Sequence, residues 1–139
     1  MDLEDFKSHL RWAEGVRRFP YTDTTGHVSI GVGRNLTDNG LSDDEIEYLL
    51  ENDALAAIRD ASTLPYWDSL SDTRKHIVAD LVFNMGLSGW KGFRRANAAL
   101  SRCDYVEAAR EMQASKWFRQ TGRRAIKLVD AMITDSWDD

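Results

Sequence analysis

The chain has 139 residues, a net charge of −5 and one cysteine, Cys103. This length fits one domain that buries about two thirds of its unfolded surface and so needs no disulfide. The single cysteine excludes an intrachain disulfide, and the acidic balance, with no recognisable binding motif, argues against a nucleic-acid-binding protein.

The first predicted element is an amphipathic helix that ends near Gly15. Asp2 is placed to cap it, and apolar residues recur at helical spacing along one side, namely Leu3, Phe6, Leu10 and Ala13. Glycine after the last helical turn accepts the left-handed conformation that closes a helix. Glu14 is therefore expected at the very end of this helix.

A β-hairpin is predicted directly after the helix. Residues 21–27 read as a strand, a turn and a second strand, with Gly26 supplying the positive φ of a tight turn. The alternation over residues 27–33 places Ser29 on one face and Ile30 on the other. Asp23 lies nine residues after Glu14 and Ser29 fifteen, so a hairpin beside the helix end can aim both towards Glu14.

Beyond the hairpin the sequence predicts mainly helices. Residues 35–40 read as a loop, and the capping box from Ser42 to Glu45 starts a long helix that runs to about Ala61. Leu64-Pro65 breaks the pattern, and Ser71 caps a helix that ends at residues 84–86. Shorter helices are predicted over residues 93–100, 105–112, 115–119 and 122–134.

Two carboxyl groups and a hydroxyl in such a stretch suit hydrolysis of a glycosidic bond. One carboxyl must donate a proton to the departing oxygen, while the other stays ionised and activates water. Glu14, at a helix end beside Trp12, is the candidate for the desolvated, protonated group, and Asp23, in a polar turn, for the ionised one. Alternatively, Glu14 is a solvated helix residue, Asp23 a turn former bonded to its own backbone, and Ser29 part of a polar strand face.

The spacing resembles that of the phage-type lysozymes, the endolysins of glycoside hydrolase family 24 typified by the T-even phage enzyme. The family carries a Glu, eight residues, an Asp or Cys, five residues and a Thr before a G-[IVY]-G segment; here these are Glu14, Asp23 and Ser29, with Ser in place of Thr. Further segments follow in the family's order: residues 82–86, Gly92-Phe93, residues 107–109, residues 115–121, Arg124-Ala125 and Ser136-Trp137-Asp138.

This resemblance implies an α+β, predominantly helical, lysozyme-like fold of two lobes with a small antiparallel β-sheet in the first. The N-terminal lobe would span residues 12–60 and the helical C-terminal lobe residues 61–139, with helix 1–11 packing on the second. It implies hydrolysis of the β-1,4 bond between N-acetylmuramic acid and N-acetylglucosamine in peptidoglycan. Glu14 would be the general acid, Asp23 the group that activates water and Ser29 its second anchor, with inversion at the anomeric carbon.

Other residues receive roles from the same resemblance. The expected substrate-binding residues are Leu36, Asn84, Phe118, Gln120 and Arg124. Arg124 would cross the cleft to Glu14, and Asp53 would pair with Arg34. Trp117 and Trp137 are expected in the core. No metal or cofactor is expected, since His9, His27 and His76 show no ligand spacing.

Charge and targeting signals set the expected partners. Residues 1–73 carry six Lys/Arg and fifteen Asp/Glu, whereas residues 74–139 carry twelve and eight, so the second half can attract the anionic peptidoglycan. The sequence shows no signal peptide or membrane span. We therefore expect a monomer that waits in the host cytoplasm and reaches the periplasmic wall after holin-mediated release, without inserting in the membrane.

Two rival functions stay open. A lytic transglycosylase would use one carboxylic acid on the same polymer and leave anhydro ends without consuming water, and the presence of both Asp23 and Ser29 argues against it. A non-catalytic wall-binding module on the same fold would bind peptidoglycan without lysing cells.

Overall fold

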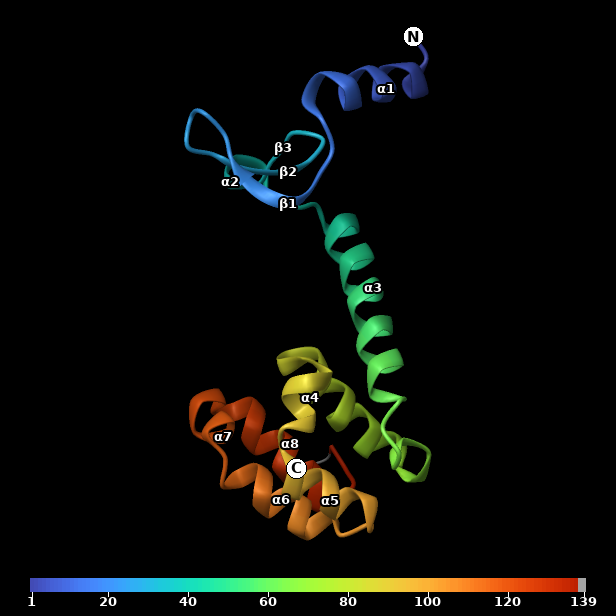
Figure 1. Ribbon diagram of the computed structural model, residues 1–139, viewed down its shortest axis with the longest axis vertical. Coiled ribbons are helices and arrows are strands. Elements are labelled where there is room, and N and C mark those ends of the chain that lie inside the picture. Colours follow the sequence, from blue (N-terminus) through green and yellow to red (C-terminus); the bar gives the residue numbers. More distant parts are fainter. Residues whose placement is uncertain (138–139) are drawn as a thin grey trace. The chain divides into compact units, whose positions relative to one another are not determined.

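The computed structural model describes residues 1–137, in two compact units, Met1–Leu49 and Leu50 onward. Helices predominate and one small antiparallel sheet lies near the N-terminus, which confirms the predicted α+β class (Figure 1). The boundary between the units falls inside helix α3 (Asp43–Ala61). The predicted lobe limits and the packing of residues 1–11 on the second lobe stay predictions, and Asp138 lies outside the described residues.

Helix α1 (Leu3–Glu14) begins and ends as its sequence predicts. The Asp2 carboxylate accepts a hydrogen bond from the Asp5 amide at 3.1 Å, an N-cap worth about 1 kcal/mol. Gly15, with φ of 76°, donates its amide to the Arg11 carbonyl and ends the helix. Glu14 is consequently the last helical residue, and the first strand begins at Arg17 after Gly15 and Val16.

The sheet has three strands in the order β1 (Arg17–Thr22), β2 (Val28–Gly31) and β3 (Arg34–Asn35), all antiparallel. The predicted hairpin is confirmed, and Gly26 takes φ of 87° in its turn. Ser29 lies in the central strand, paired with Tyr21 on one side and Asn35 on the other. The register thus fixes Ser29 at the middle of the sheet.

The segment predicted as a loop after the sheet contains structure, so that prediction is wrong. Residues 34–35 form β3 and Leu36–Asn39 form the short helix α2. The side-chain Oδ1 atom of Asn35 caps α2 by accepting the Asp38 amide at 3.0 Å, and the Asn35 Nδ2 atom donates to the Asp38 carboxylate at 2.9 Å. The helix packs beside β2 and β3.

Helix α3 starts with the predicted capping box. The Ser42 hydroxyl accepts from the Glu45 amide at 3.2 Å, and the Glu45 carboxylate accepts from the Ser42 amide at 2.8 Å.

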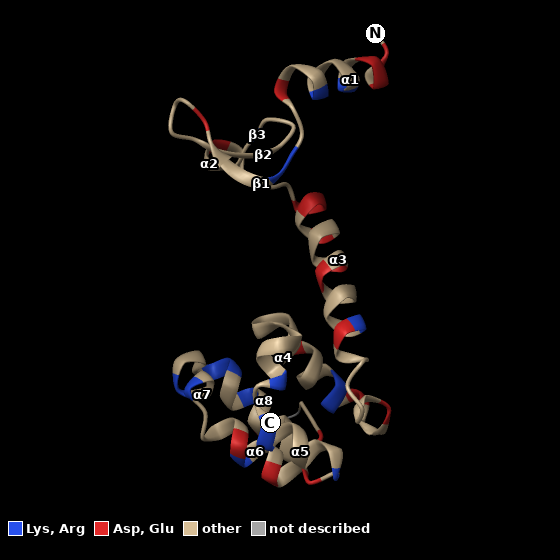
Figure 2. Ribbon diagram, in the orientation of Figure 1, with Lys and Arg blue, Asp and Glu red and all other residues tan. Residues whose placement is uncertain are grey.

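Acidic residues occur along most of α3, whereas α7 (Lys116–Thr121) carries Lys116 and Arg119 and no acidic residue (Figure 2).

The second unit is helical. After α3 come a 3₁₀ turn, η1 (Trp67–Ser69), and then α4 (Asp72–Lys91), α5 (Arg94–Ser101), α6 (Tyr105–Gln113), α7 and α8 (Arg123–Thr134). Ser71 caps α4 as predicted, by accepting the Arg74 amide at 3.2 Å. Gly86 interrupts α4 with a non-helical conformation, φ 79° and ψ 160°, at the point where the sequence predicts the helix to end.

The hydrophobic core lies in this second unit. Within residues 1–137, every fully buried apolar side chain falls between Ala57 and Met132, and Trp90 is the largest of those with no exposed surface. Trp117 and Trp137, expected in the core, are partly buried and pack against it. Among the described residues no helix is both long and apolar enough to cross a membrane.

Candidate active site

Glu14 lies against the glycine turn between β2 and β3. A Cβ atom added to Gly33 would stand 3.1 Å from the Glu14 Oε2 atom and 3.2 Å from its Cδ atom. Gly33 has φ of 67°, so both the backbone conformation and the contact favour glycine here. The end of α1 and the β2–β3 turn therefore meet at Glu14, whose side chain is exposed rather than desolvated. That Asp23 and Ser29 are aimed at Glu14 stays a prediction.

Asp23 follows β1 and organises the hairpin turn. Its Oδ1 atom accepts hydrogen bonds from the Thr25 amide at 2.9 Å, the Thr25 hydroxyl at 2.7 Å and the His27 amide at 3.0 Å. Its own amide donates to the His27 carbonyl at 2.8 Å. The turn-forming alternative therefore describes the local geometry correctly.

The same hydrogen bonds favour the ionised form of Asp23. The Thr25 hydroxyl, and after it the His27 amide, hold the pKa of the Asp23 carboxyl below its usual range because they stabilise the charged form. This favours the ionised state expected from the sequence. Within residues 1–137 the hydrogen bonds of this carboxylate all fall on Oδ1, which leaves Oδ2 for a water molecule.

Ser29 is the buried polar residue among the described side chains, with 4% of its surface exposed. Strands on both sides fix its backbone, so its hydroxyl is held in a rigid sheet rather than on a loop. The role of this hydroxyl as a second anchor for water stays a prediction.

Arg34 joins the sheet to the first turn of α3. Its guanidinium meets the Glu45 carboxylate at 2.7 and 2.6 Å and donates to the Gly40 carbonyl at 3.1 Å. The predicted partner, Asp53, is therefore corrected to Glu45. Asp53 lies eight residues further along α3, which is about 12 Å of helix, whereas Glu45 already sits in the capping box beside β3.

Two predicted substrate-binding residues lie together in the second unit. Asn84 and Gln120 line a pocket of about 710 Å³ between α4 and α7. The side-chain Oδ1 atom of Asn84 accepts from the Trp117 indole nitrogen at 3.2 Å. Lys116 and Trp117 line the same pocket and were not predicted as binding residues. The sequence signal that could have identified them is their position directly before Phe118, a predicted binding residue, since one is basic and the other aromatic.

The other predicted binding residues lie elsewhere. Phe118 packs, partly buried, against the core. Arg124 is outside the 710 Å³ pocket and lines a second pocket of about 1360 Å³, where its Nε atom donates to the Asp80 carboxylate at 2.9 Å. Leu36 is half-buried as the first residue of α2 in the first unit. The contact of Arg124 with Glu14 stays a prediction, and sequence reasoning missed Asp80.

Metal coordination has no candidate in the described part of the chain. Residues 1–137 contain no group of three or more His, Cys, Asp or Glu side chains placed to hold a metal ion.

Comparison with known proteins gives a consistent picture. The family model described as phage lysozyme matches residues 11–131. The chain is 27% identical to the probable T4-type lysozyme 2 of Dictyostelium discoideum and 24% identical to its probable T4-type lysozyme 1, over 95% of both chains in each case. It is also 26% identical to the pre-baseplate central spike protein Gp5 of Enterobacteria phage T4, over 90% of this chain and 27% of the spike protein.

Proposed function

Because the chain belongs to the phage lysozyme family, it is a glycosidase of the lysozyme type, and we propose that it hydrolyses the β-1,4 bond between N-acetylmuramic acid and N-acetylglucosamine in peptidoglycan. The observation that supports this most is the arrangement of the first unit. Glu14 lies against the glycine turn between β2 and β3. Asp23 lies in the β1–β2 turn of the same sheet, where hydrogen bonds lower the pKa of its carboxyl and leave Oδ2 free of hydrogen bonds among the described residues.

The two carboxyl groups take different roles. Glu14 donates its proton to the glycosidic oxygen as the bond to the sugar breaks. Asp23, through Oδ2, accepts a proton from the attacking water, and the Ser29 hydroxyl holds the same water. Water attacks the face opposite to the leaving group, so the anomeric configuration inverts, which requires the two carboxyls to stand roughly 6.5–9.5 Å apart during the reaction.

The second unit supplies contacts to the polymer. The pocket lined by Asn84 and Gln120 offers amide donors and acceptors for acetamido groups and peptide amides. Lys116 at the same pocket offers a cation for peptide carboxylates. Leu36, Phe118 and Arg124 are assigned further substrate contacts on the family pattern.

The biological role we propose is lysis of the host cell at phage release. In this account the enzyme accumulates in the host cytoplasm as a monomer and reaches the periplasmic peptidoglycan once a holin opens the inner membrane. The support is the family pattern together with the net positive charge of residues 74–139, which suits an anionic wall polymer.

The mechanism is tested on purified Gram-negative peptidoglycan. Mass spectrometry of the products should show reducing N-acetylmuramic acid ends that carry one added water. NMR during the first turnovers should show the α-anomer released before mutarotation. Anhydro ends would instead identify a lytic transglycosylase, a β-anomer would identify a retaining reaction, and binding without any product would identify a wall-binding module.

A further inference from the structure

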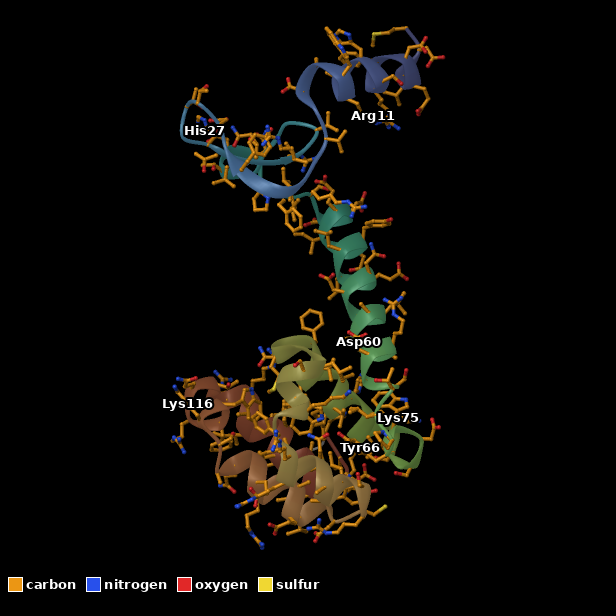
Figure 3. The ribbon with its side chains drawn as sticks, viewed as in Figure 1. Arg11, His27, Asp60, Tyr66, Lys75 and Lys116 are labelled. Atoms are coloured by element: carbon orange, nitrogen blue, oxygen red, sulfur yellow. The ribbon has the colours of Figure 1, made fainter. Side chains whose placement is uncertain are left out.

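His27 lies at the turn of the β1–β2 hairpin (Figure 3). Its ring lies near the carboxylates of two acidic residues, Asp23 and Asp38. Its Nδ1 atom is 2.5 Å from the Thr25 hydroxyl and 3.8 Å from the Asp23 Oδ1 atom. Its Nε2 atom is 3.3 Å from the Asp38 Oδ2 atom, on helix α2. A chain of polar contacts therefore runs from Asp38 through His27 and Thr25 to the carboxylate that activates water.

The direction of these hydrogen bonds follows from counting protons. A threonine hydroxyl has one proton to donate, and Thr25 lies 2.7 Å from the Asp23 Oδ1 atom, which as a carboxylate oxygen can only accept. The Thr25 oxygen must then accept its other short hydrogen bond, so the Nδ1 atom of His27 carries a proton. The contact is too short for two groups that both act as acceptors.

The other ring nitrogen faces the same constraint. An ionised Asp38 only accepts, so the Nε2 atom of His27 must also carry a proton to interact favourably with it. With both nitrogens protonated the ring is an imidazolium. The carboxylates of Asp38 and Asp23 form ion pairs with this imidazolium.

We propose that His27 is a positioning residue for Asp23, acting through the Thr25 hydroxyl. This inference rests on the proposed function. The imidazolium keeps the Thr25 hydroxyl pointing at Asp23, so the Oδ1 atom stays occupied and the Oδ2 atom faces the water. When the ring loses its Nδ1 proton to solvent, Nδ1 becomes an acceptor, and the Thr25 hydroxyl turns to donate to the ring instead of to Asp23.

The turn of this hydroxyl changes Asp23 in two ways. The carboxylate loses one of its three donors and with it the largest cause of its lowered pKa, the Thr25 side-chain hydrogen bond. It also loses a rotational constraint and keeps the two backbone amides. Catalysis should therefore depend on whether the Nδ1 atom of His27 carries a proton.

Steady-state kinetics on soluble peptidoglycan fragments, measured from pH 4.5 to 8.5, test the proposal. In the native chain kcat should fall as His27 loses its proton. Thr25→Val and His27→Ala should lower kcat in the acidic half of this range by about tenfold and leave KM within about twofold. Both variants should also lose the fall in kcat that accompanies deprotonation of His27. Thr25→Ser keeps the hydroxyl, so it should retain both the native kcat and this pH-dependent fall.

The matched control is Thr24→Val, in the same turn, which makes no hydrogen bond recorded for the described residues and should behave as the native chain. Nitrogen-15 NMR of the His27 ring, assigned with His27→Ala, gives a readout that needs no activity. In the native chain the ring should be doubly protonated when charged and carry its proton on Nε2 when neutral. Asp38→Asn and Thr25→Val should each shift its titration.

The outcomes separate this inference from the proposed function. Kinetic pH profiles of His27→Ala and Thr25→Val that superimpose on the native one overturn the positioning role while hydrolysis stands. A His27 titration unchanged by both Asp38→Asn and Thr25→Val overturns it as well. A folded native chain that releases no product from peptidoglycan overturns the proposed function, and the ring titration then still decides whether the relay forms.

Discussion

Replacing Gly33 by alanine should damage catalysis more than stability. Gly33 has φ of 67°, where an alanine costs roughly 1–2 kcal/mol of folding free energy. The new methyl would stand 3.1 Å from the Glu14 Oε2 atom, whereas ordinary contacts begin at 3.4 Å and extend to 4 Å. The Glu14 carboxyl must therefore retreat by a few tenths of an ångström.

The kinetic consequence can be scaled from this displacement. A misplacement of 1 Å at a reacting group costs on the order of 100-fold in rate, so about half of that distance corresponds to roughly tenfold. The expected result is a tenfold loss of kcat in Gly33→Ala, measured as release of reducing ends from peptidoglycan at a temperature where circular dichroism shows the variant fully folded.

Gly31→Ala is the matched control. Gly31 has φ of 68°, so an alanine there carries the same backbone cost, but a Cβ would meet no atom within 4 Å. Its unfolding free energy should fall as much as that of Gly33→Ala, with kcat within about twofold of the native value. Equal losses of kcat in the two variants, or full activity in Gly33→Ala, would refute the placement of Glu14 against the turn.

Two further predictions concern stability. The Tyr66 hydroxyl, on a residue labelled in Figure 3, accepts from the buried Trp90 indole at 2.9 Å and donates to the Asn97 side chain at 2.5 Å. Tyr66→Phe should therefore lower the unfolding free energy by about 2 kcal/mol and Tm by roughly 6–10 °C in calorimetry, and an unchanged Tm would contradict this. Arg34, and after it the Ser42 hydrogen bonds, lower the pKa of Glu45 to about 2, so the stability from these contacts is present above about pH 4.5 and is lost as pH falls towards 2. Glu45→Gln should flatten that part of the curve of unfolding free energy against pH, and parallel curves for the two proteins would exclude the coupling.

Local signals predicted most of the fold. Helix caps at Asp2, Ser42 and Ser71 each bond within three residues, so their geometry is decided by neighbouring sequence alone. Gly26 marks the hairpin for the same reason. The short helix α2 was missed although Asn35 carries a capping signal, because four residues give too little periodicity to recognise.

Side-chain partners across elements were harder to predict. Arg34 pairs with Glu45 rather than with Asp53, because strand β3 places the Arg34 guanidinium beside the first turn of α3. The direction of the chain after such a short strand cannot be predicted from the local spacing of residues. Trp117, assigned to the core, packs there and also donates to Asn84, since an indole has an apolar ring and a polar edge. The relay through His27 arises from a turn geometry that residue types alone do not show.

The measurement that tests the central claim most directly is the rate of reducing-end release from purified peptidoglycan by the native chain and by Glu14→Gln, with Glu4→Gln as control. Glu4 also lies on α1, where it pairs with Lys7 in exposed positions away from the hairpin. We predict hydrolysis by the native chain and by Glu4→Gln, and a loss of several orders of magnitude in Glu14→Gln with folding unchanged. Hydrolysis by Glu14→Gln at the native rate would contradict the assignment of Glu14 as the general acid.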